Sequence, residues 1–195
     1  MLAVGLLLTG CGDDEPDGGS DSADASADHN TADVAFASDM IQHHAQALAM
    51  VDLTVELALD PEVQALAEAI RAAQGPEIET MSDWLQEWDE EVPETMRDHS
   101  NAGHDMEGMG DSMEGMESDM PGMMTADDFD ELESAPDADF QTMWLEMMVE
   151  HHEGAVSMAE TQLDEGENPA AKELAQAIID TQESEIERMQ DLLGA

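Results

Sequence analysis

The sequence matches itself, without a gap, at an offset of 108 residues. Between residues 40–85 and 148–193, 17 of the 46 aligned positions are identical, and His43-His44 falls on His151-His152. Self-similarity at a fixed spacing is typical of a repeated structural unit. We therefore predict two copies of one unit, separated by an insert, and this constrains the fold more than any other feature.

Each unit has the pattern of a helical hairpin. Apolar residues recur at intervals of three and four between Val34 and Val55, as on one face of an amphipathic helix. Asp60-Pro61 and Asn168-Pro169 each place a capping side chain before a proline, which predicts the start of a second helix. Because one hairpin is too thin to enclose a core, the two should pack together. The predicted fold is all-α, an antiparallel four-helix bundle.

The predicted hairpins cover residues 31–89 and 128–195, the second with a short lead-in. Residues 12–30 are rich in Asp, Ser, Gly and Ala and contain almost nothing apolar, so we expect a disordered acidic tether. Residues 90–127 form the insert, in which Met and His lie among Gly, Ser, Asp and Glu.

The amino terminus resembles a bacterial lipoprotein signal. Leu2–Leu8 is an apolar run with the length of a signal-peptide core, too short to span a bilayer. It ends in Leu8-Thr9-Gly10-Cys11, which resembles the lipobox whose cysteine is lipidated. We expect residues 1–11 to be the signal, Cys11 the lipidation site, and the protein to be extracytoplasmic and membrane-bound only through its lipid. The alternative is a cysteine without function near a frayed terminus.

The charge of the chain excludes several classes of partner. There are 49 Asp and Glu against 4 Lys and Arg, a net charge of −45. Such a field repels phosphate backbones, so no nucleic acid is expected, and cations are the natural partners. A single cysteine also excludes a disulfide scaffold and cysteine-based zinc sites.

Methionine and histidine provide the candidate ligands, with 17 Met and 7 His in the chain. Thioether and imidazole both suit Cu(I), and thioether discriminates against Mg²⁺ and Ca²⁺. On a helical wheel His44 lies inside the apolar arc and His43 at its edge near Met50, so one histidine of each pair should face the interior. The structural alternative is methionine as core filling and histidine as a satisfied buried group. The candidates in the two units are Met40, His43, His44, Met50, Met81, Met148, His151, His152, Met158 and Met189.

The insert carries a second group of candidate ligands. Its glycines disfavour a stable helix, whereas repeated Met-x-x-Met steps allow a flexible chain to wrap thioethers around a soft ion. The alternative is a low-complexity linker, in which exposed, oxidisable methionine would be an unusual choice. These candidates are His99, His104, Met106, Met109, Met113, Met116, Met120, Met123 and Met124.

Two motifs resemble the family catalogued as domain of unknown function 305, which includes CopM-like periplasmic copper-binding proteins. They read Phe36-x-x-x-Met40-Ile41-x-His43-His44-x-x-Ala47-x-x-Met50 and Leu66-Ala67-x-x-Ile70-x-x-x-Gln74-x-x-Glu77-Ile78-x-x-Met81-x-x-Trp84-Leu85. The resemblance covers residues 31–88 and 137–194. It implies a ferritin-like bundle, bacterial origin, an extracytoplasmic location and a role in copper or silver tolerance. The implied site residues are His43, His44, His151, His152, Met40, Met50, Met148 and Met158.

The leading hypothesis is a non-enzymatic protein that sequesters Cu(I) or exchanges it with a copper donor or acceptor protein, with Ag(I) as a second candidate ion. A di-iron oxidase would need Glu-x-x-His on two helices, and that spacing is absent from the sequence. The third hypothesis is an acidic structural or interaction module of the cell envelope, in which His and Met are merely packed.

Overall fold

The computed structural model describes residues 28–55, 57–95 and 120–194. The proposed signal with Cys11, and the tether as far as residue 27, lie outside these ranges. The described residues form five helices and no strand, which confirms the all-α prediction for this part of the chain. The helices are α1 (Thr31–Asp52), α2 (Pro61–Glu87), α5 (Ala126–Ser134), α6 (Asp137–Glu165) and α7 (Pro169–Leu193).

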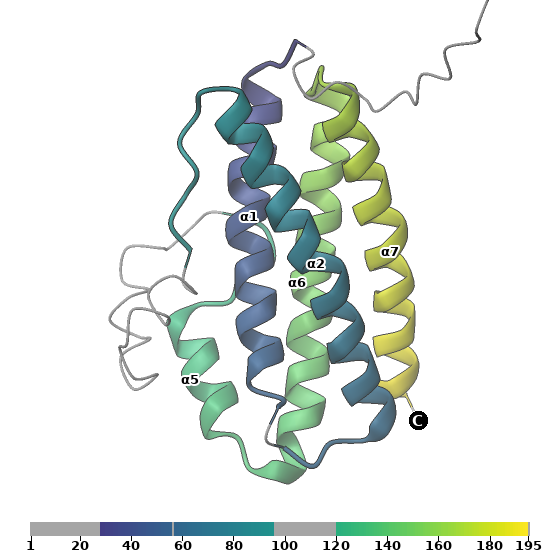
Figure 1. Cartoon of the computed structure of the whole chain (residues 1–195). Helices are drawn as coiled ribbons and strands as arrows, with labels where there is room; N and C mark the ends of the chain where they lie inside the picture. The colour runs from purple at the N-terminus through teal and green to yellow at the C-terminus, as the bar shows by residue number, and fades with distance from the viewer. Residues whose placement is uncertain (1–27, 56, 96–119, 195) are drawn as a thin grey trace, which may run out of the picture.

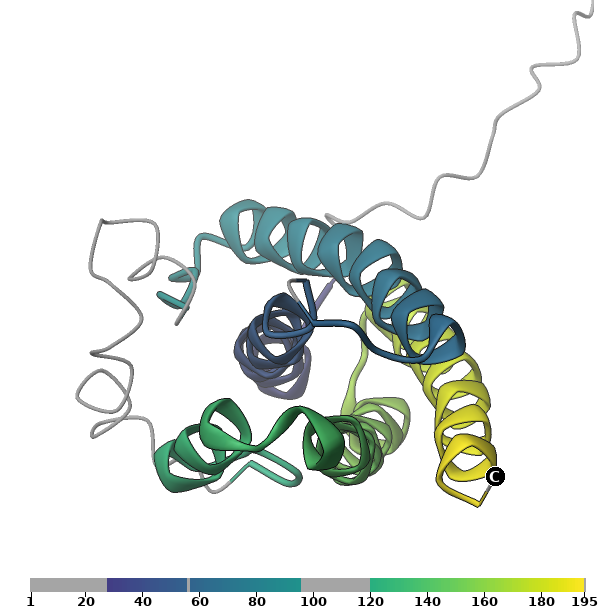
Figure 2. The same cartoon turned by 90° about the horizontal axis from the view of Figure 1, so that it is seen from below.

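The four long helices pack as a bundle. Helix α1 packs against α2 and α6, and α7 packs against α6 and contacts α2, so the contacts form a closed ring. Helices that pack against each other in this ring run in opposite directions, whereas α2 and α6, which lie diagonally across it, run in the same direction (Figure 1). The short helix α5 packs against α6 and lies at one side of the bundle (Figure 2). None of the described helices is long and apolar enough to cross a bilayer.

The predicted helix starts before Pro61 and Pro169 are confirmed. The Asp60 side chain accepts a hydrogen bond from the backbone of the first turn of α2, and Asn168 accepts two from the first turn of α7. In each case proline occupies the first helical position, where its missing N–H is not needed.

Each hairpin also holds the loop of the other. The carboxylate of Asp33 on α1 accepts hydrogen bonds from the backbone N–H groups of Glu167 and Asn168, between α6 and α7. Gln141 on α6, which follows Asp33 by 108 residues, accepts one from the backbone N–H of Asp60, between α1 and α2 (2.8 Å). Backbone groups that the loops leave unpaired are thus satisfied by the opposite hairpin.

The structure adds detail at two boundaries of the predicted segments. Helix α5 begins inside the predicted insert at Ala126, because Thr125 and Asp128 form a capping box that starts a helix there, and the expected lead-in is helical. The last two residues of the predicted tether contact the helices. Asn30 caps α1 and donates to the carbonyl of Glu165 at 2.9 Å, while the His29 ring stacks on Trp88.

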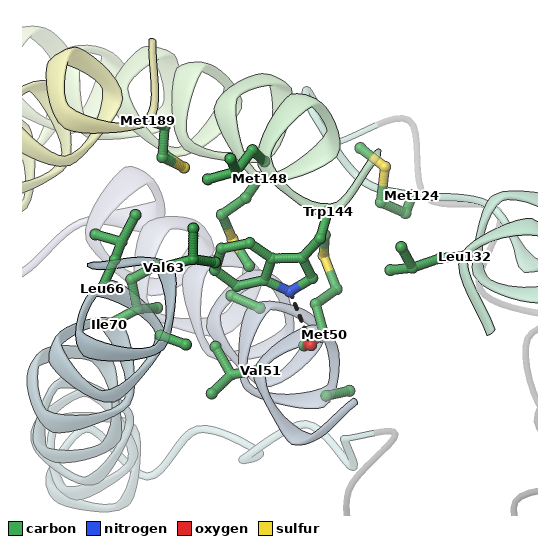
Figure 3. Close-up of a cluster of buried hydrophobic side chains, with 14 of the residues drawn as sticks. Met50, Val51, Val63, Leu66, Ile70, Met124, Leu132, Trp144, Met148 and Met189 are labelled. Atoms are coloured by element: carbon green, nitrogen blue, oxygen red, sulfur yellow. Dashed lines mark hydrogen bonds between the residues drawn. The ribbon is translucent and has the colours of Figure 1, made fainter. Parts of the chain in front are cut away.

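The buried apolar side chains fall into two clusters at opposite ends of the bundle. The Trp144 cluster includes Met50, Met124, Met148 and Met189, and Figure 3 shows the indole of Trp144 among them. The Trp84 cluster includes Met40 and Met81. Between the two lie buried polar residues that belong to neither, here called the polar layer: His43, His44, Gln74, His151, His152 and Gln182.

The Asp33→Asn variant tests the link between the hairpins. Burial raises the pKa of Asp33, but hydrogen bonds from Asn30, Gln162, Glu167 and Asn168 outweigh it and hold the pKa below its usual value. The variant replaces an acceptor with an amide that faces these donors. We expect a loss of about 1–3 kcal/mol in the free energy of unfolding, measured with urea at neutral pH.

The depressed pKa of Asp33 also fixes how this loss depends on pH. The stabilisation is complete above the pKa of the unfolded carboxyl, near 3.8, and is lost as the pH falls through the lower folded value. The difference in free energy of unfolding between wild type and Asp33→Asn should therefore disappear in strong acid. The control is Asp164→Asn on the exposed side of α6. Equal stability of both variants at neutral pH would contradict the link.

Candidate metal centre

All four histidines of the two pairs are fully buried, at 0% exposure each. The helical-wheel prediction that His43 and His151 lie at the edge of the interior is therefore wrong. The reason is tertiary, because residues 121–124 cover the outer side of α1 and α6 at this level. The carbonyl of Pro121 contacts His43, and the backbone of Met124 is hydrogen-bonded to Gln46.

The imidazoles form a line across the bundle. His44 on α1 contacts Glu77 on α2, and His152 on α6 contacts Glu185 on α7. Between these outer pairs the rings of His43 and His151 meet at the interface of α1 and α6, with their centroids 3.8 Å apart and a tilt of 45°. The polar layer thus joins all four long helices, and the matched residues His43 and His151 face each other at its centre.

Three of the rings are hydrogen-bonded to an oxygen through their Nε2 atom. His44 Nε2 lies 2.7 Å from Glu77 Oε2, and His152 Nε2 lies 2.8 Å from Glu185 Oε2. His43 Nε2 lies 3.0 Å from the carbonyl oxygen of Pro121. Carbonyl and carboxylate oxygens only accept, so Nε2 carries the proton and donates in each case. The remaining ring nitrogen, Nδ1, then keeps its lone pair.

Five imidazole nitrogens in the layer are buried without a hydrogen-bond partner among the described residues. They are Nδ1 of His43, His44 and His152, and both nitrogens of His151. Buried polar atoms are usually paired, and each unpaired one carries a desolvation cost. Nδ1 of His43, His44 and His152 therefore presents a lone pair, and the neutral ring of His151 presents one lone pair and carries one N–H.

Burial keeps the two central rings neutral. Desolvation, together with the neighbouring His44, lowers the pKa of His43 to about 3, and outweighs the opposing effect of its hydrogen bond to Pro121. Desolvation also lowers the pKa of His151 well below its usual value, with further contributions from the surrounding histidines. At neutral pH both rings therefore retain the neutral form that binds metals.

Four residues of this region were not predicted from the sequence as site residues. Glu77 and Glu185 orient the outer histidines, and Gln74 and Gln182 lie one turn before them, almost completely buried. Both amide atoms of Gln74, and the oxygen of Gln182, lack a partner within the described ranges. All four were visible as identical polar residues at the offset of 108, within otherwise apolar helix faces.

Four of the predicted methionine ligands border the polar layer, each at 0% exposure. Met40 and Met148 precede the histidine pairs by about one helical turn, on α1 and α6. Met81 and Met189 follow Glu77 and Glu185 by about one turn, on α2 and α7. Each apolar cluster thus contributes two thioethers at its end of the layer.

The other methionines lie in different surroundings. Met50 lies within the Trp144 cluster, and its backbone carbonyl accepts a hydrogen bond from the Trp144 indole at 2.9 Å (Figure 3). Met124 belongs to the same cluster. Met158 is half-buried and lines a surface pocket of about 220 Å³ between α1 and α6. Met120 and Met123 are half-buried before α5. Six candidates lie outside the described residues: His99, His104, Met106, Met109, Met113 and Met116.

The ligand types near the layer decide which metal ions it could suit. Within the described part of the chain, no group of three or more His, Cys, Asp or Glu side chains is placed to hold a metal ion. The buried methionines that border the layer offer thioethers, which hard ions avoid, while the nearby carboxylates of Glu77 and Glu185 are already hydrogen-bonded to histidines. Neutral imidazole and thioether together fit a soft monovalent ion such as Cu(I), which needs few ligands and no carboxylate.

Solved structures with the same fold come from several related proteins, whereas no curated protein matches the sequence. A DUF305 fragment from Deinococcus radiodurans is 28% identical, with a TM-score of 0.68 over 85% of this chain and 97% of its own. A DUF305 protein from Streptomyces coelicolor, described as proposed to be secreted, is 32% identical, with a TM-score of 0.68 over 84% and 91%.

CopM in its Cu(I)-bound form is 27% identical, with a TM-score of 0.61 over 82% of this chain and 94% of its own. Structures of CopM also exist in Cu(II)-bound and Ag-bound forms. The family model for the domain of unknown function DUF305 matches residues 33–193, which include all five helices except the first two residues of α1. The chain therefore belongs to the DUF305 family.

Proposed function

We propose that this chain is an extracytoplasmic, lipid-anchored protein that binds Cu(I), with Ag(I) as a second ion, and either sequesters it or passes it to a partner protein. The observation that carries the proposal is the polar layer, with five unpartnered imidazole nitrogens bordered by four buried methionines. The copper-bound and silver-bound forms of the relative CopM support it. We assign the fold to the ferritin-like type of four-helix bundle.

The layer is costly for the protein without an ion. Burying polar atoms without partners opposes folding, and the cost falls when another group uses their lone pairs. A monovalent soft ion would do so without displacing a proton from a thiol, and it would bring little charge into an apolar interior. We propose Nδ1 as the metal-binding atom of His43, His44 and His152, because the Nε2 atom of each already donates to oxygen.

The carboxylates of Glu77 and Glu185 have a supporting role in this proposal. A metal-binding histidine usually donates its other N–H to a carboxylate or carbonyl, which fixes the ring and raises its basicity. Glu77 and Glu185 do this for the two outer histidines. The methionine-rich insert is proposed as a separate capture segment, in which the surrounding acidic residues raise the local concentration of cations.

Anaerobic Cu(I) titration against a competing chelator tests the proposal. Wild type should take up Cu(I) stoichiometrically, and His43→Gln/His151→Gln should lose the ion held in the layer while keeping any held by the insert. Replacing Met106, Met109, Met113 and Met116 by Leu should have the opposite effect. Absence of Cu(I) and Ag(I) uptake by folded wild type would contradict the proposal.

A matched pair of Met→Leu variants separates ligands from core residues. Met148→Leu removes a thioether at the border of the layer, so the affinity for Cu(I) should fall by about tenfold or more, since even outer-shell changes cost that much. Met50→Leu changes a residue inside the Trp144 cluster and should leave the affinity as in wild type. Chelator competition measures both. Equal affinities would show that Met148 is core filling.

The buried histidines also predict a pH dependence of the apo protein. An unfolded histidine binds a proton near pH 6.5, whereas folded His43 does so only near 3, so the unfolded state binds more protons between these values. Stability from this group is present above pH 6.5 and falls as the pH decreases through the window. His43→Gln should remove part of this slope in urea unfolding at a series of pH values.

The control for this comparison is His29→Gln, which removes a half-buried histidine outside the layer. Carboxylates titrate in the same window, but they are common to all three proteins, so the difference between slopes isolates the histidine. If the free energy of unfolding depends on pH in the same way in wild type and in His43→Gln, the burial of a neutral His43 is contradicted.

A further inference from the structure

The segment Pro121–Met124, here called the strap, bridges α1 and α6 beside the polar layer. Met124 is held by two hydrogen bonds to the Gln46 side chain, with its N–H donating at 2.7 Å and its carbonyl accepting at 2.9 Å. At the other end of the strap the carbonyl of Pro121 accepts the proton of His43 Nε2. The strap thus places one backbone oxygen against one ring of the layer.

Two glycines fix how closely the strap approaches α6. A Cβ atom on Gly154 would overlap the carbonyl group of Pro121, so a side chain at this position would push the strap away from the helix. Gly122 has a φ of +73°, and a Cβ atom there would lie 2.6 Å from the carbonyl oxygen of Glu150. This close approach needs a residue without a side chain at both positions.

The strap makes the two central histidines unequal. His43 and His151 match at the offset of 108, but only His43 has an oxygen on Nε2, whereas neither nitrogen of His151 has a partner among the described residues. Gln46, which holds the strap, is matched by Gly154, which makes room for it. Gln46 on α1 and Gly154 on α6 therefore both contribute to the position of the strap.

We infer that the strap is a positioning element that fixes His43 in its Nε2–H tautomer and thereby selects Nδ1 as its metal-binding nitrogen. The metal-binding part of this inference rests on the proposed function, whereas the tautomer is a property of the apo protein. Pro121 acts through its carbonyl, and Gln46 and Gly154 act through the strap. Removing such a partner typically lowers metal affinity by about 10–100-fold, because the ring loses orientation and basicity.

The test uses Gly154→Ala with Gly75→Ala as its matched control. Both substitutions put a methyl group on a helical glycine, but at Gly75 the new Cβ meets nothing within 4 Å. Nitrogen-15 correlation spectra of the imidazole rings report the tautomer of each histidine in the apo protein. Wild type and Gly75→Ala should show His43 as the Nε2–H form, and Gly154→Ala should shift it towards Nδ1–H.

The outer histidines serve as internal references, because Glu77 and Glu185 hold them independently of the strap. Their tautomers should not change in Gly154→Ala, while the affinity for Cu(I) in chelator competition should fall about tenfold. Gln46→Leu removes both hydrogen bonds to Met124 without adding bulk at the strap, and it should give the same shift. This second variant decides the question if Gly154→Ala does not fold.

An unchanged His43 tautomer in the folded variants would overturn the inference, as would equal shifts at His43, His44 and His152, which would indicate general loosening. If wild type binds no Cu(I), the proposed function fails, yet the tautomer spectra still decide whether the strap positions His43. If Cu(I) binds as tightly to Gly154→Ala as to wild type, the function stands and the role of the strap in binding fails.

Discussion

The structure depends on burying four imidazoles in the middle of a helical bundle. Their burial divides the apolar core into two clusters and joins all four long helices through one polar layer. Only part of the layer is satisfied from within, since Glu77, Glu185 and Pro121 each accept from one ring, and five ring nitrogens remain unpartnered among the described residues. On the proposed function, an ion bound in the layer would use these lone pairs and offset the cost of burying them.

The sequence predicts the helices and their starts well, because their signals are local. The apolar period marks α1, and a capping side chain before Pro61 and Pro169 marks α2 and α7. It does not predict that His43 is buried, because a helical wheel treats one helix with one covered face. The strap, about 80 residues further along the chain, buries a second face of α1. No local sequence pattern predicts that contact.

The surroundings of the methionines could not be predicted from the sequence either. Their number indicates soft-metal chemistry in general, but only the fold determines which of them lie near the histidines. Met148 borders the layer, Met50 packs around Trp144, and Met158 lines a surface pocket, although Met50 and Met158 match at the offset of 108. The matched pair diverges because α5 adds Phe129 and Leu132 to the cluster around Met50, whereas no corresponding helix of the described residues packs beside Met158. The carboxylates and amides of the layer were detectable, since matched polar residues interrupt apolar faces.

Anomalous diffraction from crystals of the protein loaded anaerobically with Ag(I) tests the central claim most directly. The account predicts a silver peak inside the polar layer, at bonding distance from Nδ1 of at least one histidine and from a bordering methionine sulfur. It is contradicted if the loaded crystals show silver only outside the layer, with the imidazoles of His43 and His151 still without a ligand.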